Sequence, residues 1–339
     1  MASITMSGGP GGLSSDPILS VSVVTYNSSH CLPAFFASLR QQRDVKWELF
    51  YFDNASRDGT AELIRQEKLG ELFVSEENIG YGRAHNHNAI RCRGAYLLFL
   101  NPDLEFGPDL FASLVRYLEQ HPSHALAGPR ILEGDDRREF PPRHFYPGEG
   151  MVALEPGLRR ATIAWLSGCC LLVRREVFDK VGRFDPDYFL YQEETDLCLR
   201  ARRAGYHIGH AGDTAVNHLH RQSQRELSEN EYRRRIFEGS ALFWEKHYAR
   251  RDVLRMVRFQ YWVTRMLLGL KPIRRWLPPL PAVLSEARLQ ARNDVCRRWL
   301  DKHGYRRIGL CGVPGKIASR QCHIAIEWLR QGQFPLDDY

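Results

Sequence analysis

Several patterns are missing from this 339-residue sequence, and each absence narrows the class of protein. Its eight cysteines show no CxxC pair and no zinc-ligand spacing. Adjacent Cys169 and Cys170 sit in an apolar run, so we expect buried thiols. Such cysteines fit a reducing cytosol better than a secreted scaffold held by disulfides. No segment reaches the ~18 uninterrupted apolar residues of a membrane-spanning helix. Residues 1–17 are rich in Gly and Ser and lack the pattern of a secretory signal. We therefore expect a disordered leader over residues 1–17 and a protein kept in the cytoplasm.

Acidic side chains are scarce in one stretch of an otherwise mixed sequence. The formal net charge is +7, and Asp252 is the only acid from Arg250 to Arg275. An anionic partner fits this balance: nucleic acid, anionic lipid or a phosphorylated substrate. Nucleic acid is disfavoured because no binding motif for it occurs and the basic residues lie mainly beyond the predicted sheet. Residues 255–268 are amphipathic and aromatic, which is typical of helices at membrane surfaces, and a helix packed on the rest of the chain or in a homodimer fits equally well.

Short apolar runs alternate with amphipathic segments along the first hundred residues. The pattern predicts strands at 18–25, 47–52, 72–75 and 96–100, and helices at 31–42, 60–68 and 84–91. This alternation predicts an α/β fold with a parallel sheet and helices on both faces. Further along, we expect a helix at 108–119, strands at 128–133 and 166–173, and an irregular loop between these strands. The expected organisation is an α/β domain over residues 18–225 and a basic helical region over residues 226–339.

Polar side chains follow three of the predicted strands directly. Tyr26 and Asn27 follow the first strand, Asp53 and Asn54 close the second, and residues 101–103 (Asn-Pro-Asp) follow the fourth. Ligands of open α/β sheets bind at the carboxyl ends of the strands. We therefore expect the three clusters to share one site.

A second acidic group, Glu193, Glu194 and Asp196, stands after the aromatic-rich residues 184–191 and at the start of a predicted helix. Acids stabilise a helix N-terminus, which accounts for one or two of the three. It does not account for the acids at 103 and 105, which follow a strand. Two acidic sites at element ends suggest a general base and a metal site.

Taken together, these segments resemble the GT-A inverting glycosyltransferases of family 2. Five segments carry the resemblance, in the family's order: Ser22-Val23-Val24-Thr25-Tyr26-Asn27, Asp53-Asn54-Ala55-Ser56, Asn78-Ile79-Gly80-Tyr81-Gly82, Leu100-Asn101-Pro102-Asp103 and Glu193-Glu194. The resemblance covers about residues 20–223 and implies a Rossmann-like mixed, mostly parallel sheet flanked by helices, with a helical C-terminal extension. It implies nucleotide contacts from Thr25, Tyr26, Asn27, Asp53, Asn78, Gly80 and Asn101.

The resemblance also implies a divalent cation. Asn101-Pro102-Asp103 occupies the place of the family's DxD motif, so Asp103 would be a ligand of Mg²⁺ or Mn²⁺, which prefer oxygen ligands. Asn101 cannot carry the charge of the first DxD carboxylate. His218 is the candidate second ligand and His220 the substitute, while a structural or phosphate-contacting role is an equal alternative for either histidine.

Glu193-Glu194 matches the family's ED base motif. A carboxylate that takes the proton of an acceptor hydroxyl permits a single displacement, and therefore predicts inversion at the anomeric carbon. We assign the base to Glu194 by its position in the motif. Glu193 remains the alternative, because glutamate is one methylene longer than the family's usual aspartate at position 194.

Acceptor contacts are expected from Trp165, Ser167 and Gly168, in a segment that resembles the loop before the family's acceptor-side strand, and from Asp196. An aromatic ring can stack on the apolar face of a sugar, although a core position for Trp165 is the alternative. For Asp196 the alternative is a role in orienting a neighbour or capping the helix.

A finer resemblance is to bacterial rhamnosyltransferases of cell-surface polysaccharide assembly. It is carried by residues 101–103, by residues 191–198 (Tyr-Gln-Glu-Glu-Thr-Asp-Leu-Cys) and by the His…Ser stretch at 218–223. This resemblance implies dTDP-L-rhamnose as donor and a polyprenyl-linked or growing glycan as acceptor, in O-antigen, capsule or cell-wall synthesis. Such an acceptor implies a peripheral position on the inner face of the cell membrane. The alternatives are a UDP- or GDP-sugar donor, and a catalytically inactive carbohydrate-binding relative.

Overall fold

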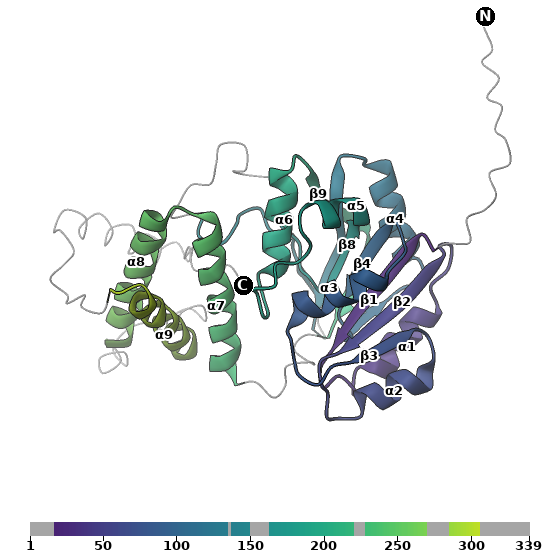
Figure 1. The fold of residues 1–339 in the computed structure, drawn as a ribbon, viewed down its shortest axis with the longest axis horizontal. Helices are drawn as coiled ribbons and strands as arrows, with labels where there is room; N and C mark the ends of the chain where they lie inside the picture. The colour runs from purple at the N-terminus through teal and green to yellow at the C-terminus, as the bar shows by residue number, and fades with distance from the viewer. Residues whose placement is uncertain (1–16, 135–136, 150–162, 220–227, 270–284, 306–339) are drawn as a thin grey trace, which may run out of the picture.

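The computed structural model describes residues 17–134, 137–149, 163–219, 228–269 and 285–305. These residues form a sheet flanked by helices, with three further helices beside it (Figure 1). Residues 1–16 of the leader expected over 1–17, and the C-terminal residues 306–339, lie outside the described residues.

The first half of the sheet is parallel, in the strand order β3-β2-β1-β4. Its strands are β1 (Leu19–Thr25), β2 (Trp47–Asp53), β3 (Glu71–Val74) and β4 (Tyr96–Leu100). Every residue of β1 and β4 is buried, as expected of parallel strands covered on both faces. The four predicted strands are confirmed to within one residue at each end.

The second half of the sheet is mixed. Its strands are β5 (Leu104–Phe106), β6 (His124–Glu133), β7 (Arg138–Phe140), β8 (Cys170–Arg174) and β9 (His207–His218). Strand β8 runs antiparallel to β4 and to β6, whereas β9 runs parallel to β6 and antiparallel to β5. Parallel pairing still extends over more residues than antiparallel pairing, so the expected mixed, mostly parallel sheet is confirmed. Strand β9 was not predicted, and β8 begins four residues later than expected because residues 166–169 form the approach to the strand.

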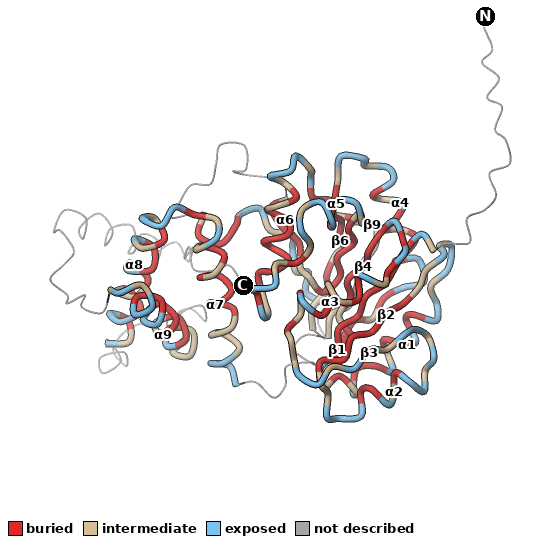
Figure 2. The backbone as a smooth tube through the Cα atoms, viewed as in Figure 1, coloured by how far each residue is buried: buried red, intermediate tan, exposed pale blue. Residues whose placement is uncertain are grey.

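Helices cover both faces of the sheet, because alternate residues of the central strands face opposite sides. Leu97 and Phe99 of β4 share one core with Phe184 and Leu197, while Leu98 and Leu100 belong to the other. The first face is covered by α3 (Tyr81–Arg91), α5 (Arg175–Lys180) and α6 (Glu193–Arg203), and the second by α1 (Leu32–Arg40), α2 (Thr60–Glu67) and α4 (Leu110–Gln120). Between these layers β1 and β4 are buried along their whole length, whereas β3 at the edge of the sheet is largely exposed (Figure 2).

Helix α3 begins at Tyr81, three residues before the predicted start. Gly80 makes this early start possible, because its backbone lies at φ +91° and a β-carbon there would lie 2.4 Å from the carbonyl oxygen of Phe189. Any other residue at position 80 would clash with the segment that leads into α6.

The helical region consists of α7 (Glu229–His247), α8 (Arg250–Gly269) and α9 (Glu286–Lys302), of which α7 lies nearest α6 in Figure 1. Helix α7 begins with a capping box formed by Ser228 and Glu231. The apolar residues of the three helices continue the core on the α6 face of the sheet, through Phe243, Val257 and Trp299. In the part of the chain that the structure describes, no helix is both long and apolar enough to cross a bilayer.

Candidate active site

Asp53 joins the ends of β1 and β2. Its Oδ1 accepts hydrogen bonds from Thr25 Oγ1 (2.7 Å) and Ser56 Oγ (2.6 Å), and its Oδ2 accepts one from the Ser56 N–H (2.9 Å). The carboxylate is completely buried. In this arrangement Asp53 braces the strand ends, and its predicted contact with a nucleotide stays a prediction.

Tyr26 and Asn27 follow β1 at the same edge of the sheet. The Tyr26 ring is 39% exposed, so it offers a face on which a base can stack. Asn27 has φ +48° and accepts a hydrogen bond from the Arg57 N–H through its side chain (2.9 Å). Asn27 thus shapes the loop that presents Tyr26.

The loop at residues 78–80 is held by asparagine side chains. Asn54 accepts from the Ile79 N–H (3.1 Å) and donates to the Gly80 carbonyl (3.3 Å), and Asn78 Oδ1 accepts from the Gly80 N–H (3.0 Å). The loop also touches the segment before α6, because the Tyr81 N–H donates to the Phe189 carbonyl (3.0 Å). The predicted nucleotide loop and the predicted base segment are therefore in direct contact.

Glu193 and Glu194 begin α6 and are almost fully buried, at 3% and 6% exposed. A β-carbon added at Gly82 of α3 would lie 3.6 Å from Cβ of Glu193, and one added at Gly168 would lie 3.5 Å from Cβ of Glu194. The two predicted bases thus lie beside the start of α3 and beside the segment before β8.

Burial and the neighbouring carboxylate change the ionisation of Glu193. Burial, and then the neighbouring Glu194, raise the pKa of Glu193 well above its ordinary value. Among the described residues, Glu193 Oε2 has no hydrogen-bond partner. Burial and the repulsion between the two carboxylates therefore favour the protonated form of Glu193.

Tyr81 is a neighbour of both carboxylates that the sequence analysis did not single out. Its hydroxyl donates to the Gly168 carbonyl (2.6 Å), and burial followed by the charges of Glu193 and Glu194 raises the pKa of Tyr81 well above 10. The sequence feature that could have identified Tyr81 is its position directly after Gly80 in the predicted nucleotide loop. Tyr81 therefore links that loop to the predicted acceptor segment.

Asp103 and His218 meet because β5 pairs with β9, which sets Leu104 opposite His218. Asp103 Oδ1 lies 3.4 Å from His218 Nε2, and Glu133 Oε1 lies 3.8 Å from His218 Nδ1. Burial lowers the pKa of His218, but Asp103, Cys169 and Glu133 together outweigh burial and leave that pKa well above 6.5. The two predicted metal ligands are thus brought together, whereas His220 lies outside the described residues.

The donor atoms of this pair fit the expected cation. A carboxylate oxygen and an imidazole nitrogen suit Mn²⁺, and Mg²⁺ is commonly held by one or two carboxylates together with substrate phosphates. Across the described residues, no set of three His, Cys, Asp or Glu side chains is arranged to hold a metal by itself. A cation here would take its remaining ligands from a diphosphate and water.

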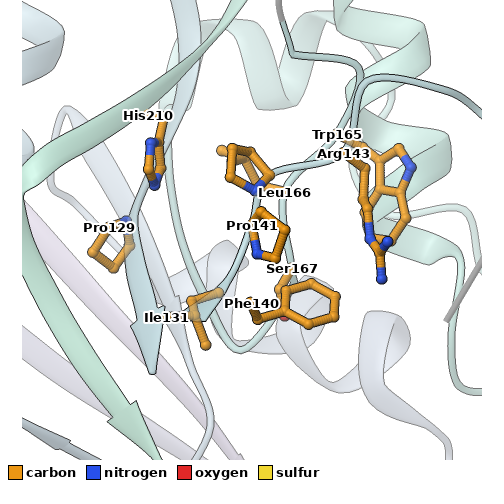
Figure 3. Close-up of a pocket in the computed structure, with 10 residues that line it drawn as sticks. Pro129, Ile131, Phe140, Pro141, Arg143, Trp165, Leu166, Ser167 and His210 are labelled. Atoms are coloured by element: carbon orange, nitrogen blue, oxygen red, sulfur yellow. The ribbon is translucent and has the colours of Figure 1, made fainter. Parts of the chain in front are cut away.

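The predicted acceptor segment borders a small, shallow pocket that is partly open to solvent. Figure 3 shows Arg143 and Trp165 on one side of the pocket and Pro129 and His210 on the other. Ser167 also lines it. The Trp165 ring is only 1% exposed and donates to the Phe145 carbonyl (3.0 Å). Trp165 therefore occupies a core position, which was the alternative interpretation of this residue. Its ring offers no open face on which a sugar could stack.

Asn101 and Asp196 have roles within the protein itself. The Asn101 N–H donates to the Cys169 carbonyl (2.9 Å), which joins the end of β4 to the acceptor segment. Asp196 is 1% exposed, and its two oxygens contact Arg200 and His247. In this arrangement Asp196 orients its neighbours, and direct contact with an acceptor stays a prediction.

The comparison with known families places this geometry in a class of enzymes. The description "Glycosyl transferase family 2" matches residues 20–182, and "Glycosyl transferase family group 2" matches residues 103–285. The protein is a glycosyltransferase, and it belongs to family 2.

Individual relatives refine this assignment. The N-acetylglucosaminyl-diphospho-decaprenol L-rhamnosyltransferase of Mycobacterium tuberculosis is 31% identical over 222 residues, which are 56% of this chain and 72% of that protein. Rhamnosyltransferase WbbL of Escherichia coli is 29% identical over 168 residues, or 43% of this chain and 62% of WbbL. The chain thus resembles rhamnosyltransferases, as expected.

A solved structure shows the same fold. The mannosyltransferase PcManGT from Pyrobaculum calidifontis, in complex with GDP-Man and Mn²⁺, superposes with a TM-score of 0.51 at 16% identity, over 95% of this chain and 85% of that one. The expected GT-A-like fold is confirmed.

Proposed function

We propose that the protein transfers a sugar from a nucleotide sugar to a hydroxyl group with inversion at the anomeric carbon, and that Glu194 is the general base. The observation that carries the proposal is the buried pair of carboxyl groups at the start of α6, in which burial and the neighbouring Glu194 raise the pKa of Glu193. We infer that Glu193 holds a proton and that Glu194 carries the charge. Glu194 takes the proton of the acceptor hydroxyl. The hydroxyl oxygen bonds to the anomeric carbon on the face opposite the leaving group, and the bond from that carbon to the diphosphate breaks.

The donor would bind at the ends of β1, β2 and β4. Tyr26 would stack on the base, and the loop at residues 78–80 would contact the nucleotide, braced by Asn54. Asp103 and His218 would hold Mg²⁺ or Mn²⁺, whose charge would stabilise the departing diphosphate.

The acceptor would approach along Ser167 and Gly168, beside Glu194. The pocket next to them combines the apolar Phe140 and Pro141 with Arg143, whose Nε is buried and has no hydrogen-bond partner among the described residues. Apolar surface with a few polar groups is typical of a small-molecule site. We propose that this pocket takes part of a saccharide acceptor.

For the donor we propose dTDP-L-rhamnose, and for the acceptor a polyprenyl-diphosphate-linked glycan of a cell-surface polysaccharide. The names of the mycobacterial and E. coli relatives, both rhamnosyltransferases, support the sugar. The mycobacterial name also supports a lipid-linked acceptor. UDP- and GDP-sugars are the alternative donors.

A lipid-linked acceptor requires access to a membrane surface, and we propose that α8 supplies it at the cytoplasmic face. The apolar side of α8 is buried in the protein, so insertion into the bilayer is not the favoured mode. Arg255, Arg258 and Arg265 are exposed and would instead attract anionic headgroups.

Calorimetric binding of dTDP-L-rhamnose, UDP-glucose and GDP-mannose, each with and without Mn²⁺, tests the donor. We expect metal-assisted binding of the dTDP sugar, at least about 10-fold tighter than the other two, a difference of about 1.4 kcal/mol. Preference for a UDP or GDP sugar would contradict the proposal that dTDP-L-rhamnose is the donor, but it would leave the proposed inverting mechanism unchanged. Absence of binding to all three would favour the inactive carbohydrate-binding alternative.

A further inference from the structure

We propose that helix α7 positions the catalytic helix α6, and that His247 is the positioning residue at the centre of this contact. The proposal rests on the proposed role of Glu193 and Glu194 as the base pair of the transferase. It assigns a catalytic purpose to a helix that lies outside the sheet.

The first contact lies at the turn before Glu193. Tyr191 and Gln192 both have positive φ, +72° and +74°, a conformation that costs about 1 kcal/mol or more per residue. Gly239 of α7 packs against this turn so closely that a β-carbon there would lie 2.6 Å from the Tyr191 carbonyl oxygen. Gln192 Nε2 also donates to Ser240 Oγ (3.2 Å). Helix α7 therefore holds the unfavourable turn from which the base pair projects.

The second contact is a chain of polar groups, and its geometry defines the state of His247. Arg203 Nη1 lies 2.7 Å from His247 Nδ1, and His247 Nε2 lies 2.7 Å from Asp196 Oδ1. Arginine only donates, so Nδ1 must accept and the proton of the neutral imidazole must sit on Nε2. His247 then donates to Asp196, two residues beyond Glu194 in the first turn of α6.

Asp196 connects His247, through Arg200, to the residues that follow α5. Its Oδ2 accepts from Arg200 Nε (2.7 Å), and Arg200 in turn donates to the carbonyls of Val181 and Arg183 at the end of α5. His247 and Asp196 are nearly inaccessible, at 6% and 1% side-chain exposure. Hydrogen bonds to buried polar groups such as these hold one arrangement of the elements that carry them. The first turn of α6 is thus held from α7 on one side and α5 on the other.

Lys246 adds a third contact in the same region. Its Nζ lies 2.8 Å from Asp185 Oδ2 and 2.6 Å from Asp187 Oδ2, both in the segment that leads to Glu193. Helix α7 therefore contacts the segment around the base pair at three places: at Asp185 and Asp187, at the turn of Tyr191 and Gln192, and at Asp196. Catalysis is sensitive to such positioning, because an error of about 1 Å can cost about 100-fold in rate.

Substitution of His247 tests the proposal. His247→Phe keeps the ring that packs on Phe243 but removes the donor and the acceptor, whereas His247→Gln offers a donor to Asp196 and an acceptor to Arg203. We expect kcat to fall about 10- to 100-fold in the Phe variant, with unchanged calorimetric affinity for the donor, and to stay within about 3-fold of the wild type in the Gln variant. His303→Phe is the matched control, because the polar contacts of His303 among the described residues are with Glu245 and Trp299 of the helical region.

Two results would overturn the positioning role. One is a wild-type kcat in His247→Phe, and the other is an equal loss in the Phe and Gln variants, which would indicate packing alone. Failure of the wild-type protein to transfer sugar from any donor would instead overturn the proposed function, and this proposal with it.

Gly239→Ala provides a second, independent test. The added methyl would collide with the Tyr191 backbone, so we expect a fall in kcat of about 10-fold or more with donor affinity unchanged. Gly269→Ala is the control, since a β-carbon at that position meets no atom within 4 Å among the described residues. Equal kcat in Gly239→Ala and Gly269→Ala would contradict the proposal.

Discussion

Asp53 and Asp103 are both buried aspartates at strand ends, but their surroundings give them different chemistry. Asp53 accepts hydrogen bonds from Thr25 and Ser56, which are hydroxyl and amide donors of its own loop. Asp103 faces the imidazole of His218 at 3.4 Å. A carboxylate surrounded by neutral donors of the chain braces the fold, whereas one that shares a site with a second ligand-type side chain can hold a cation.

Asp103→Asn tests the metal site. An amide keeps the shape of the side chain and removes its charge, so we expect transfer to fall about 100-fold or more and the affinity for Mn²⁺ in the presence of a nucleoside diphosphate to fall with it. Asp109→Asn is the control, because Asp109 is exposed at the start of α4. Calorimetric or electron-spin-resonance titration with Mn²⁺ measures the affinity, and equal values for Asp103→Asn and wild type would exclude Asp103 as a ligand.

At the residue scale the sequence could predict the side chains that carry recognisable chemistry. Glu194, Asp103 and His218 stand in motifs, and the structure brings the last two together. Tyr81 stands in the predicted nucleotide loop but was given no role of its own, and His247 stands in none of the motifs. Their importance comes from contacts with residues more than 50 positions away in the chain, which neither spacing nor periodicity reveals.

At the scale of the element, apolar pattern was a sound guide wherever a strand is covered on both faces. Strands β1 and β4 are fully buried, and both were predicted from their apolar runs. Strand β9 was missed because its sequence, HIGHAGDTAVNH, contains polar residues that face the site and the surface. The part of the sheet that brings His218 to Asp103 is therefore the part that pattern alone could not predict.

Helix α3 packs on the sheet through a buried histidine, which makes the stability of this contact depend on pH. His85 Nδ1 lies 2.7 Å from Ser22 Oγ, and burial lowers the pKa of His85 to about 3. In the unfolded chain the pKa is about 6.5, so between these values the unfolded state binds the extra proton. The contribution of neutral His85 to the free energy of unfolding is therefore fully present above about pH 6.5, and it is lost as the pH falls toward 3.

The expected loss is about 1.4 kcal/mol of unfolding free energy between pH 7.5 and 5.5. His85→Asn keeps a polar group near Ser22 and cannot titrate, so its unfolding free energy, measured by urea denaturation, should fall less over this range than that of the wild type. His144→Asn, at an exposed position, should keep the wild-type slope. Equal slopes for His85→Asn and wild type would show that His85 is not held neutral.

At the scale of the whole molecule, the described part of the helical region shares its core with the sheet domain. Phe243 of α7, Val257 of α8 and Trp299 of α9 lie in one apolar cluster with Phe99 and Leu197. The sequence predicted helices here, but amphipathic helices reveal only that one side is buried and not against what. The packing explains why α8 presents arginines, rather than an apolar face, to the outside.

Charge should therefore govern any membrane contact. Gln at positions 255, 258 and 265 of α8 removes three exposed cations, each worth about 1 kcal/mol at an anionic surface. We expect this triple variant to bind phosphatidylglycerol-containing vesicles about 100-fold more weakly in a sedimentation assay. Gln at the exposed Arg43, Arg65 and Arg116 is the control, and equal losses in the two variants would show attraction by net charge instead of by α8.

The central claim is that Glu194 is the base and that Glu193 stays protonated beside it. Single-turnover transfer from the accepted donor, measured for Glu194→Gln and Glu193→Gln with donor affinity determined by calorimetry, tests it most directly. We predict that Glu194→Gln loses at least about 1,000-fold in rate and binds the donor as the wild type does, while Glu193→Gln, which replaces one neutral group by another, loses at least about 10-fold less than that. A Glu194→Gln enzyme that transfers at the wild-type rate would contradict the account and move the base to Glu193.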